Sequence, residues 1–404
     1  MKKFIAPVIL ITIILFSEIF SYIAIRRLFN KNQKQLKKFN WIWWSIVVLL
    51  YTVLFLTRKY SGNYTRNIVV NVFMMILIAK LVLGLSYLIT IGLQAIRRKQ
   101  EESAVQKEGR REFAAKLALG TAAIPLGLMN WGVFRTAYHF KVHRPVFRFP
   151  NLPAAFSGIK IIQLSDIHTG SLQTRHQLQK AVDMVMEEQA DLIVFTGDLV
   201  NNRTDEVYPY MDVLEQLKAP MGVYSVLGNH DYGEYETWPD EQSKRENMEE
   251  MYRVHKQLGW KLMLNEHVIF EKDGEQLALI GVENWGANLH FKKYGRLDLA
   301  YKGTEAVPFK LLLSHDPSHF DTEVTEQYKD IDLTLSGHTH GFQFGIEIPG
   351  YFRWSPAQYI YKQWAGIYRK GKQYVYVNRG LGCLGYMGRV GIQPEITVLE
   401  LRTE

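Results

Sequence analysis

Four apolar runs occupy the first third of the chain. They extend over about 4–25, 39–57, 68–91 and 114–134. Each is close to the ~20 residues that a helix needs to cross a bilayer. Trp41, Trp43 and Trp44 lie at one end of the second run and Trp131 lies near the end of the fourth, and tryptophan favours the headgroup level of a membrane. The pattern predicts a four-helix transmembrane anchor over residues 1–142.

A different pattern follows the anchor. The segment 143–156 is interrupted by prolines and is interpreted as a linker. Beyond it, short apolar runs typical of buried strands alternate with helical patterns, which predicts an α/β sandwich over residues 157–404. The predicted strands are 159–164, 191–196, 222–227, 277–282, 309–314 and 332–336, and the predicted helices lie near 174–189, 241–258 and 318–329.

Charge is divided between these two parts. Residues 1–144 hold 22 Lys/Arg against 5 Asp/Glu, whereas residues 145–404 hold 26 against 35. The positive excess therefore belongs to the apolar part, as in a membrane anchor with basic loops. The acidic remainder has no basic stripe, so we expect no nucleic-acid partner. With one cysteine, Cys383, the chain forms no intrachain disulfide.

The loops between the apolar runs predict an orientation. Loops 26–40 and 97–112 each hold six Lys/Arg, and loop 58–66 holds three. Because positively charged loops stay in the cytoplasm, the N-terminus and everything after residue 134 are expected outside, with the protein in the inner membrane. The stretch 109–120, GRREFAAKLALG, resembles a twin-arginine export signal and reads equally as a basic flank.

Two ionisable residues, Glu18 and Lys80, fall within the predicted spans. Charges inside a bilayer are costly and are often functional. Two interpretations stand open: a functional Glu18–Lys80 pair, or two side chains that each face a neighbouring helix or reach toward the headgroups.

Polar clusters follow five of the predicted strands. They contribute Asp166 and His168, then Asp198, then Asn229, His230 and Asp231, then His315, and finally His338 and His340. Ligand sites of α/β sheets gather at the carboxyl ends of strands, so these clusters are expected to converge.

The residue types predict the chemistry of that site. Carboxylate, imidazole and amide ligands suit divalent metals of borderline hardness. Residues two apart in an extended segment face the same way, so Asp166 with His168, and His338 with His340, each present two ligands. Gly337 and Gly341 permit a tight backbone beside the second pair. The sequence therefore predicts a metal site.

The ordered series SDIH, GDLV, GNHD, SHDP and GHTHGFQ resembles the calcineurin-like metallophosphoesterases over about residues 157–402. The ending from 377 to 400 resembles their membrane-associated YaeI/YkuE-type branch, which includes UDP-2,3-diacylglucosamine pyrophosphatase relatives. The resemblance implies a four-layer α/β/β/α sandwich around two divalent metal ions, with Mn²⁺ as first choice and Zn²⁺, Fe or Mg²⁺ as alternatives. The chain departs from the family at 281–290, where many relatives carry an aspartate-rich segment.

The resemblance also implies roles for individual residues. One metal would be held by Asp166, His168, Asp198 and His340, and the other by Asp198, Asn229, His315 and His338. His230 would protonate the leaving oxygen, with Asp231 orienting or tuning it. The implied reaction is attack of a metal-activated hydroxide on a phosphodiester or pyrophosphate.

The substrate class is predicted from the segment that follows the last histidine pair. Residues 348–374 interleave eight aromatic side chains with basic ones, a mixture that suits a membrane interface. We therefore expect the lipid bilayer as a partner and a lipid-linked, envelope or other phosphorylated small-molecule substrate. Ordinary packing of these rings, a cytoplasmic UDP-diacylglucosamine-type pyrophosphatase, and a nuclease or nucleotide phosphodiesterase remain the alternatives.

Overall fold

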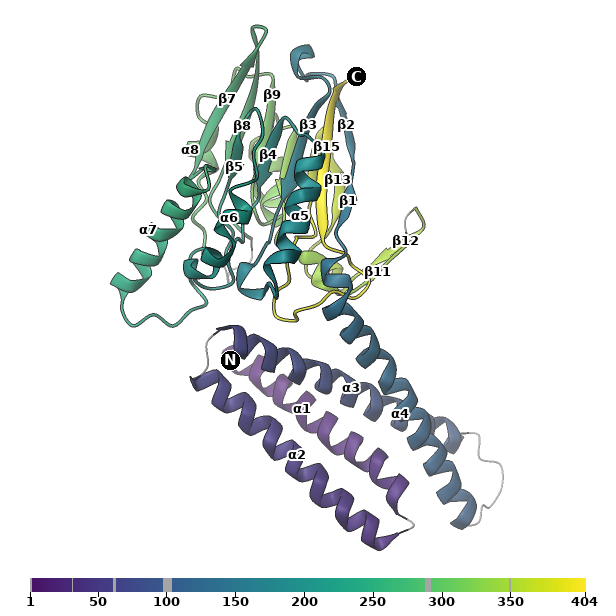
Figure 1. The fold of residues 1–404 in the computed structure, drawn as a ribbon. Coiled ribbons are helices and arrows are strands. Elements are labelled where there is room, and N and C mark those ends of the chain that lie inside the picture. Colours follow the sequence, from purple (N-terminus) through teal and green to yellow (C-terminus); the bar gives the residue numbers. More distant parts are fainter. Residues whose placement is uncertain (1, 31, 61–62, 97–103, 288–291, 349) are drawn as a thin grey trace. The chain divides into compact units, whose positions relative to one another are not determined.

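The computed structural model describes residues 2–30, 32–60, 63–96, 104–287, 292–348 and 350–404. The chain forms two compact units, shown in Figure 1. One consists of four long helices together with Gly385–Met387, and the other of Phe134–Leu384 with Gly388–Glu404. Lys31 and residues 97–99 of the predicted cytoplasmic loops, and 288–290 of the segment that departs from the family, lie outside the described residues.

The four predicted spans are four helices. They are α1 (Lys2–Arg26), α2 (Gln33–Tyr60), α3 (Asn63–Ile96) and α4 (Ala104–Phe134). Each contains a stretch that is long and apolar enough to cross a membrane. The helices extend beyond the apolar runs because their polar flanking residues continue the helix, as Gln33–Phe39 do in α2.

Small side chains make the closest contacts between these helices. One buried cluster joins Ala24 of α1 and Leu83 and Tyr87 of α3 to the alanines of α4, which are Ala114, Ala115, Ala118 and Ala122. Gly84 of α3 lies so near Phe20 of α1 that an added Cβ would stand 3.0 Å from the Phe20 Cβ. Close backbone approach at small residues is how helices associate where no water drives them together.

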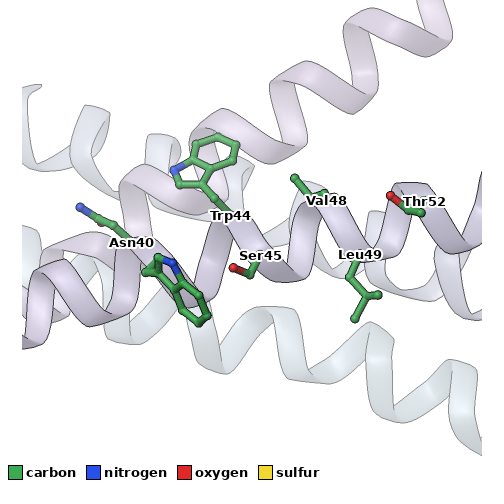
Figure 2. Close-up of a pocket in the computed structure, with 7 residues that line it drawn as sticks. Asn40, Trp44, Ser45, Val48, Leu49 and Thr52 are labelled. Carbon is green, nitrogen blue, oxygen red and sulfur yellow. The ribbon is translucent and has the colours of Figure 1, made fainter.

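The outer face of α2 keeps a hollow that no other helix lines. Asn40, Trp44, Ser45, Val48, Leu49 and Thr52 border it, as Figure 2 shows, and Trp41 completes it. Val48 and Leu49 are more than half exposed. A surface of this kind, built by one apolar helix, is suited to lipid chains.

Glu18 and Lys80 meet inside the helical unit. Lys80 Nζ lies 2.6 Å from Glu18 Oε1, and the Tyr51 hydroxyl donates to the same oxygen at 3.3 Å. The ammonium group also lies 5.0 Å from the centre of the Trp43 ring. The contacts join α1, α2 and α3, so the two charges compensate each other.

The second unit contains two mixed sheets. The first has the order β1-β15-β3-β4-β5-β6 with β2 also paired to β15, and the second has the order β13-β14-β10-β9-β8-β7. The first sheet consists of β1 (Lys141–His143), β2 (Val146–Phe149), β3 (Ile159–Leu164), β4 (Leu192–Phe195), β5 (Val223–Ser225), β6 (Lys261–Leu262) and β15 (Glu395–Thr403). The second consists of β7 (Glu266–Lys272), β8 (Glu275–Gly281), β9 (Phe309–Leu313), β10 (Leu333–Ser336), β13 (Gly366–Lys370) and β14 (Gln373–Val377).

Side-chain alternation places these sheets face to face. Ile161 and Val194 of the first sheet join Leu311 and Leu335 of the second in one buried cluster. Their neighbours on the opposite face of the first sheet, such as Ile162, pack against α5 (Arg175–Glu187) and α7 (Glu241–Gln257). Because successive strand residues point to opposite faces, each sheet presents one apolar face to its partner and the other to helices.

Helices cover both outer faces. In Figure 1, α5, α6 (Met211–Leu214) and α7 lie along one face of the first sheet. The outer face of the second sheet packs against α8 (Leu297–Tyr301) and the helical turns at Phe320–Val324. The predicted four-layer α/β/β/α sandwich is confirmed.

Two local predictions need correction. The linker expected over 143–156 was wrong for its first half, because β2 pairs in parallel with β15 and buries Phe147 and Phe149 between the sheets. The prolines at 145 and 150 bound this strand instead of excluding it. The helix expected near 318–329 is shorter, a π-helical turn at Phe320–Val324 followed by α9 (Thr325–Gln327).

Candidate metal centre

All the predicted site residues meet at one edge of the sandwich. In the first sheet β3, β4 and β5 run parallel, and in the second β9 and β10 do. The loops that leave the carboxyl ends of these five strands carry Asp166 and His168, Asp198, Asn229 to Asp231, His315, and His338 and His340. Parallel strands end at the same edge, so residues up to 174 positions apart become neighbours.

The first group, here called position A, is Asp166, His168 and His340. Their potential ligand atoms lie within 4.8 Å of one another. His340 Nε2 is 3.2 Å from Asp166 Oδ1 and 3.0 Å from His168 Nε2. All three side chains are buried. Position A could therefore hold one metal ion.

The second group, position B, is Asp198, His315 and His338, again with ligand atoms within 4.8 Å. His315 Nε2 lies 3.1 Å from Asp198 Oδ2 and 3.2 Å from His338 Nδ1. The same Asp198 oxygen is 3.6 Å from His168 Nε2 of position A. A single carboxylate oxygen thus faces both groups.

Asn229 adds an amide oxygen beside these groups. Its Nδ2 donates to the Tyr235 hydroxyl at 2.8 Å, whereas its Oδ1 is buried and accepts no hydrogen bond. A buried acceptor without a partner costs free energy of about 1–3 kcal/mol, and coordination of a cation would remove that cost. The residues present therefore fit a metal pair.

The backbone is strained where the side chains converge. Asp166, His168, Asp198, His338 and His340 all have positive φ, between 47° and 71°. For a residue with a Cβ this conformation is rare, costs of order 1 kcal/mol, and clusters at functional sites. Five of the seven predicted ligands share it, because each strand must turn sharply to aim its side chain at the common centre.

Glycine is required where loops touch at the site. A Cβ at Gly337 would overlap Ser165 Oγ and Asp166 Oδ2, and a Cβ at Gly228 would overlap Asp198 Oδ1. The prediction of tight backbone beside the histidine pair is therefore confirmed at Gly337. Gly341 adopts φ 53°.

The resemblance implied that Asp231 orients or tunes His230, but within the described residues the two side chains share no hydrogen bond. Its carboxylate accepts backbone N–H groups from four residues, which are Asp198, Leu199, Val200 and Gly228. His230 Nδ1 instead lies 2.6 Å from the carbonyl oxygen of Asn201. Asp231 therefore holds the loop of Asp198 in place. Asn201, which no sequence pattern singled out, fixes the His230 ring.

Hydrogen bonds to backbone fix two imidazoles so that their Nε2 atoms face the site. His168 Nδ1 donates to Val200 O at 3.1 Å, and His315 Nδ1 donates to Thr196 O at 2.7 Å. Metal-ligating histidines usually donate their second N–H in this way. The Nε2 atoms of both rings then lie near Asp198 Oδ2, an arrangement that calls for a cation or a proton between them.

The pKa values show how strongly the carboxylates attract positive charge. Burial lowers the pKa of His315, but the charge of Asp198 and their hydrogen bond outweigh it and raise that pKa to about 10. Burial lowers the pKa of His168 and of His338. Burial raises the pKa of Asp198, yet His315 and His230 bring it well below its usual value.

Comparison with known proteins agrees with this geometry. Residues 159–342 match the family described as Calcineurin-like phosphoesterase, and residues 1–137 match that described as Probable Calcineurin-like phosphoesterase, transmembrane domain. The chain is 30% identical over 315 residues to the metallophosphoesterase YkuE of Bacillus subtilis, covering 74% of this chain and 99% of YkuE. The chain belongs to the calcineurin-like metallophosphoesterases.

Two further relatives are similar to this chain. A zebrafish (Danio rerio) transmembrane protein with metallophosphoesterase domain is 29% identical over 77% of this chain and 68% of its own length. Phosphodiesterase YaeI of Escherichia coli is 27% identical over 64% of this chain and 86% of its own. This metallophosphoesterase is thus a metal-dependent hydrolase of phosphoesters, and its four apolar helices make it a membrane protein.

Proton release should accompany metal binding at position B. Below its pKa of about 10, His315 of the metal-free protein is protonated, and a ligating imidazole must be neutral. Affinity at this position should therefore rise up to tenfold per pH unit toward pH 10. Calorimetric Mn²⁺ titrations at pH 7.5, in buffers of different ionisation enthalpy, should show close to one proton released. The same heat in every buffer would contradict the expectation, and His315→Gln should abolish the release.

Proposed function

We propose that this metallophosphoesterase hydrolyses a phosphodiester or pyrophosphate bond in a lipid-linked or envelope substrate, using two divalent cations, preferably Mn²⁺. The observation that carries the proposal is the shared Asp198 oxygen, which lies 3.1 Å from His315 Nε2 and 3.6 Å from His168 Nε2. A carboxylate placed between two ligand groups is the arrangement expected of a bridging ligand. The name of the E. coli relative, a phosphodiesterase, favours the diester.

The ligand sets follow from the two positions. Position A would use Asp166, His168, His340 and the bridging Asp198, and position B would use Asp198, Asn229, His315 and His338. A bound pair of such cations supplies charge stabilisation to phosphoryl oxygens and lowers the pKa of water. The mixed carboxylate, imidazole and amide donors suit Mn²⁺, with Zn²⁺, Fe and Mg²⁺ as alternatives.

His230 is the proposed general acid. The carbonyl oxygen of Asn201 accepts a hydrogen bond from Nδ1 at 2.6 Å, so the ring keeps Nε2 for the substrate. The backbone N–H of His230 also donates to Asp198 Oδ1 at 2.8 Å, which ties the acid to the bridging ligand. Protonation of the leaving oxygen by a group held in this way contributes a factor of about 10²–10⁴ to the rate.

An exposed apolar hairpin supports an amphiphilic substrate. Strands β11 (Ile346–Ile348) and β12 (Phe352–Trp354) pair with each other alone. Tyr351 at their turn is 91% exposed, and Ile348 and Phe352 are about half exposed at 52% and 53%. Apolar side chains displayed on a tight turn suit insertion at a membrane interface.

The catalytic unit is proposed to face the outside of the inner membrane. The support is the excess of basic residues in loops 26–40 and 97–112, which are expected in the cytoplasm. An outside site favours a phospholipid or polyprenyl-type phosphate over nucleotide-linked substrates, which are cytoplasmic.

Asp198→Ala should abolish Mn²⁺-dependent hydrolysis of bis(4-nitrophenyl) phosphate, because it removes a ligand from both positions. His230→Ala should lower kcat by about 10²–10⁴ while two Mn²⁺ ions still bind per chain. Initial rates and metal stoichiometry of the purified full chain measure both effects. Near-normal turnover by Asp198→Ala would refute the proposed centre, and equal loss of metal and activity in His230→Ala would make His230 a ligand.

Removal of aromatic side chains from the hairpin should affect lipid substrates alone. The Tyr351→Ser, Phe352→Ser double variant should hydrolyse a phospholipid in vesicles several-fold more slowly, with unchanged rates on a short-chain analogue. Tyr208→Ser is the matched control, because Tyr208 is 48% exposed on the same unit. If the double variant hydrolysed both substrates at the rates of the unchanged protein, or lost the same fraction of its rate on each, a role of the hairpin in lipid recognition would be excluded.

A reporter at the C-terminus decides the side of the membrane. Alkaline phosphatase fused after Glu404 should be active and a fluorescent protein that folds only in the cytoplasm should be dark. An inactive alkaline phosphatase fusion and a fluorescent second fusion would place the active site in the cytoplasm. A nucleotide-linked lipid would then be the favoured substrate.

A further inference from the structure

Two tyrosines touch predicted ligands of position B. Tyr361 belongs to the segment that follows β12, and its hydroxyl lies 2.7 Å from His338 Nε2. Tyr235 follows β5, and its hydroxyl accepts from Asn229 Nδ2 at 2.8 Å. We propose that Tyr235 and Tyr361 are positioning residues that set the metal affinity of position B, an inference that rests on the metal centre of the proposed function.

Tyr361 selects the nitrogen that His338 presents. The Nδ1 atom of His338 faces position B, 3.2 Å from His315 Nε2. If Nδ1 holds the metal, the proton of the neutral ring must sit on Nε2, where the Tyr361 oxygen accepts it. Asp316 Oδ2 lies 3.7 Å from the same Nε2 and favours the same tautomer. The phenol therefore holds the ring in the ligating state.

Tyr235 fixes the orientation of the Asn229 amide in a similar way. An asparagine amide can face the metal with either its oxygen or its NH₂ group, and only the oxygen is a ligand. Because Nδ2 donates to Tyr235, the buried Oδ1 is left without a protein partner. The Tyr235 ring also lies 4.5 Å from the His230 ring, so the same side chain contacts the proposed acid.

Three other ligands of the centre have backbone partners, whereas His340 Nδ1 lies 3.4 Å from the Arg389 guanidinium. His168 is fixed by Val200 O and His315 by Thr196 O, and Asp166 accepts the His338 N–H at 3.0 Å. Backbone groups of a packed sandwich move little, whereas a phenol can rotate about its side-chain bonds. Two of the four proposed ligands of position B, Asn229 and His338, therefore depend on phenol side chains.

Both tyrosines can also be reached by substrate. Tyr235 is 46% exposed, and Tyr361 is partly buried on the same insert as the apolar hairpin. A substrate that enters beside the hairpin would meet the phenols that hold His338 and Asn229.

Tyr235→Phe and Tyr361→Phe should each weaken Mn²⁺ binding at position B by about 10–100-fold and leave position A unchanged. Two-site titration of the full chain in detergent, by calorimetry and by electron paramagnetic resonance of free Mn²⁺, measures both affinities. The Mn²⁺ concentration for half-maximal activity should rise in parallel, and kcat should recover at saturating Mn²⁺. Recovery at high metal separates positioning from a role in the chemical step.

Tyr208→Phe is the control, because it removes a phenol that donates to Glu250 at 2.7 Å on the surface of the same unit. Its two Mn²⁺ affinities should equal those of the unchanged protein. Unchanged affinities in both site variants, or equal weakening at positions A and B, would overturn the inference while leaving the proposed centre intact. Failure of the unchanged protein to bind two Mn²⁺ ions would instead refute the proposed function.

Discussion

The carboxylate of Asp198 is the constraint around which the catalytic unit is organised. One oxygen faces imidazoles from both sheets, and the other accepts the backbone N–H of His230. Several acceptor atoms therefore point at one small volume, an arrangement that only positive charge stabilises. In the protein alone a proton on His315 meets this need, and in the family it is met by divalent metal.

Hydrogen bonds from the surrounding loops hold the ligands in place although the backbone of these ligands is strained. Five ligands adopt positive φ, and Asp231 holds the Asp198 loop through four backbone N–H groups. The loop after β14 adds a further restraint, since Leu381 N donates to Ser165 O and Gly382 N to Asp166 O. Buried Arg379 and Glu395, 2.5 Å apart, fix the start of β15 beside it. Strain of this kind persists only where the structure over-determines it.

The two positions differ in how their ligands are held. His168 of position A and His315 of position B contact the carbonyl oxygens of Val200 and Thr196. His338 and Asn229, both of position B, instead contact phenols from loops. The phenols belong to segments with exposed apolar side chains, in a protein that also carries four apolar helices. Position B therefore combines one imidazole held by backbone, His315, with two ligands whose partners are side chains.

The sequence by itself determined the four helices, the layered sandwich and the identity of the converging residues. Apolar runs near 20 residues and alternation along strands are local signals, and polar residues after Leu164 or Leu335 are conspicuous because buried strands rarely end in them. The ordered series of motifs then allowed Asp198, the Asp166–His168 pair and the His338–His340 pair to be selected before any coordinates.

Only the tertiary structure decided the partners of those residues. Asn201, Tyr235 and Tyr361 carry no local signal, because their role depends on contacts made across the fold. The same applies to Asp231, whose carboxylate accepts backbone N–H groups. It applies also to β2, because the flanking prolines favoured a linker where the structure has a strand paired with β15. Sequence patterns indicate whether a side chain lies on the buried or the exposed face of its helix or strand. Hydrogen-bond partners that are distant in the sequence are determined by how the elements pack.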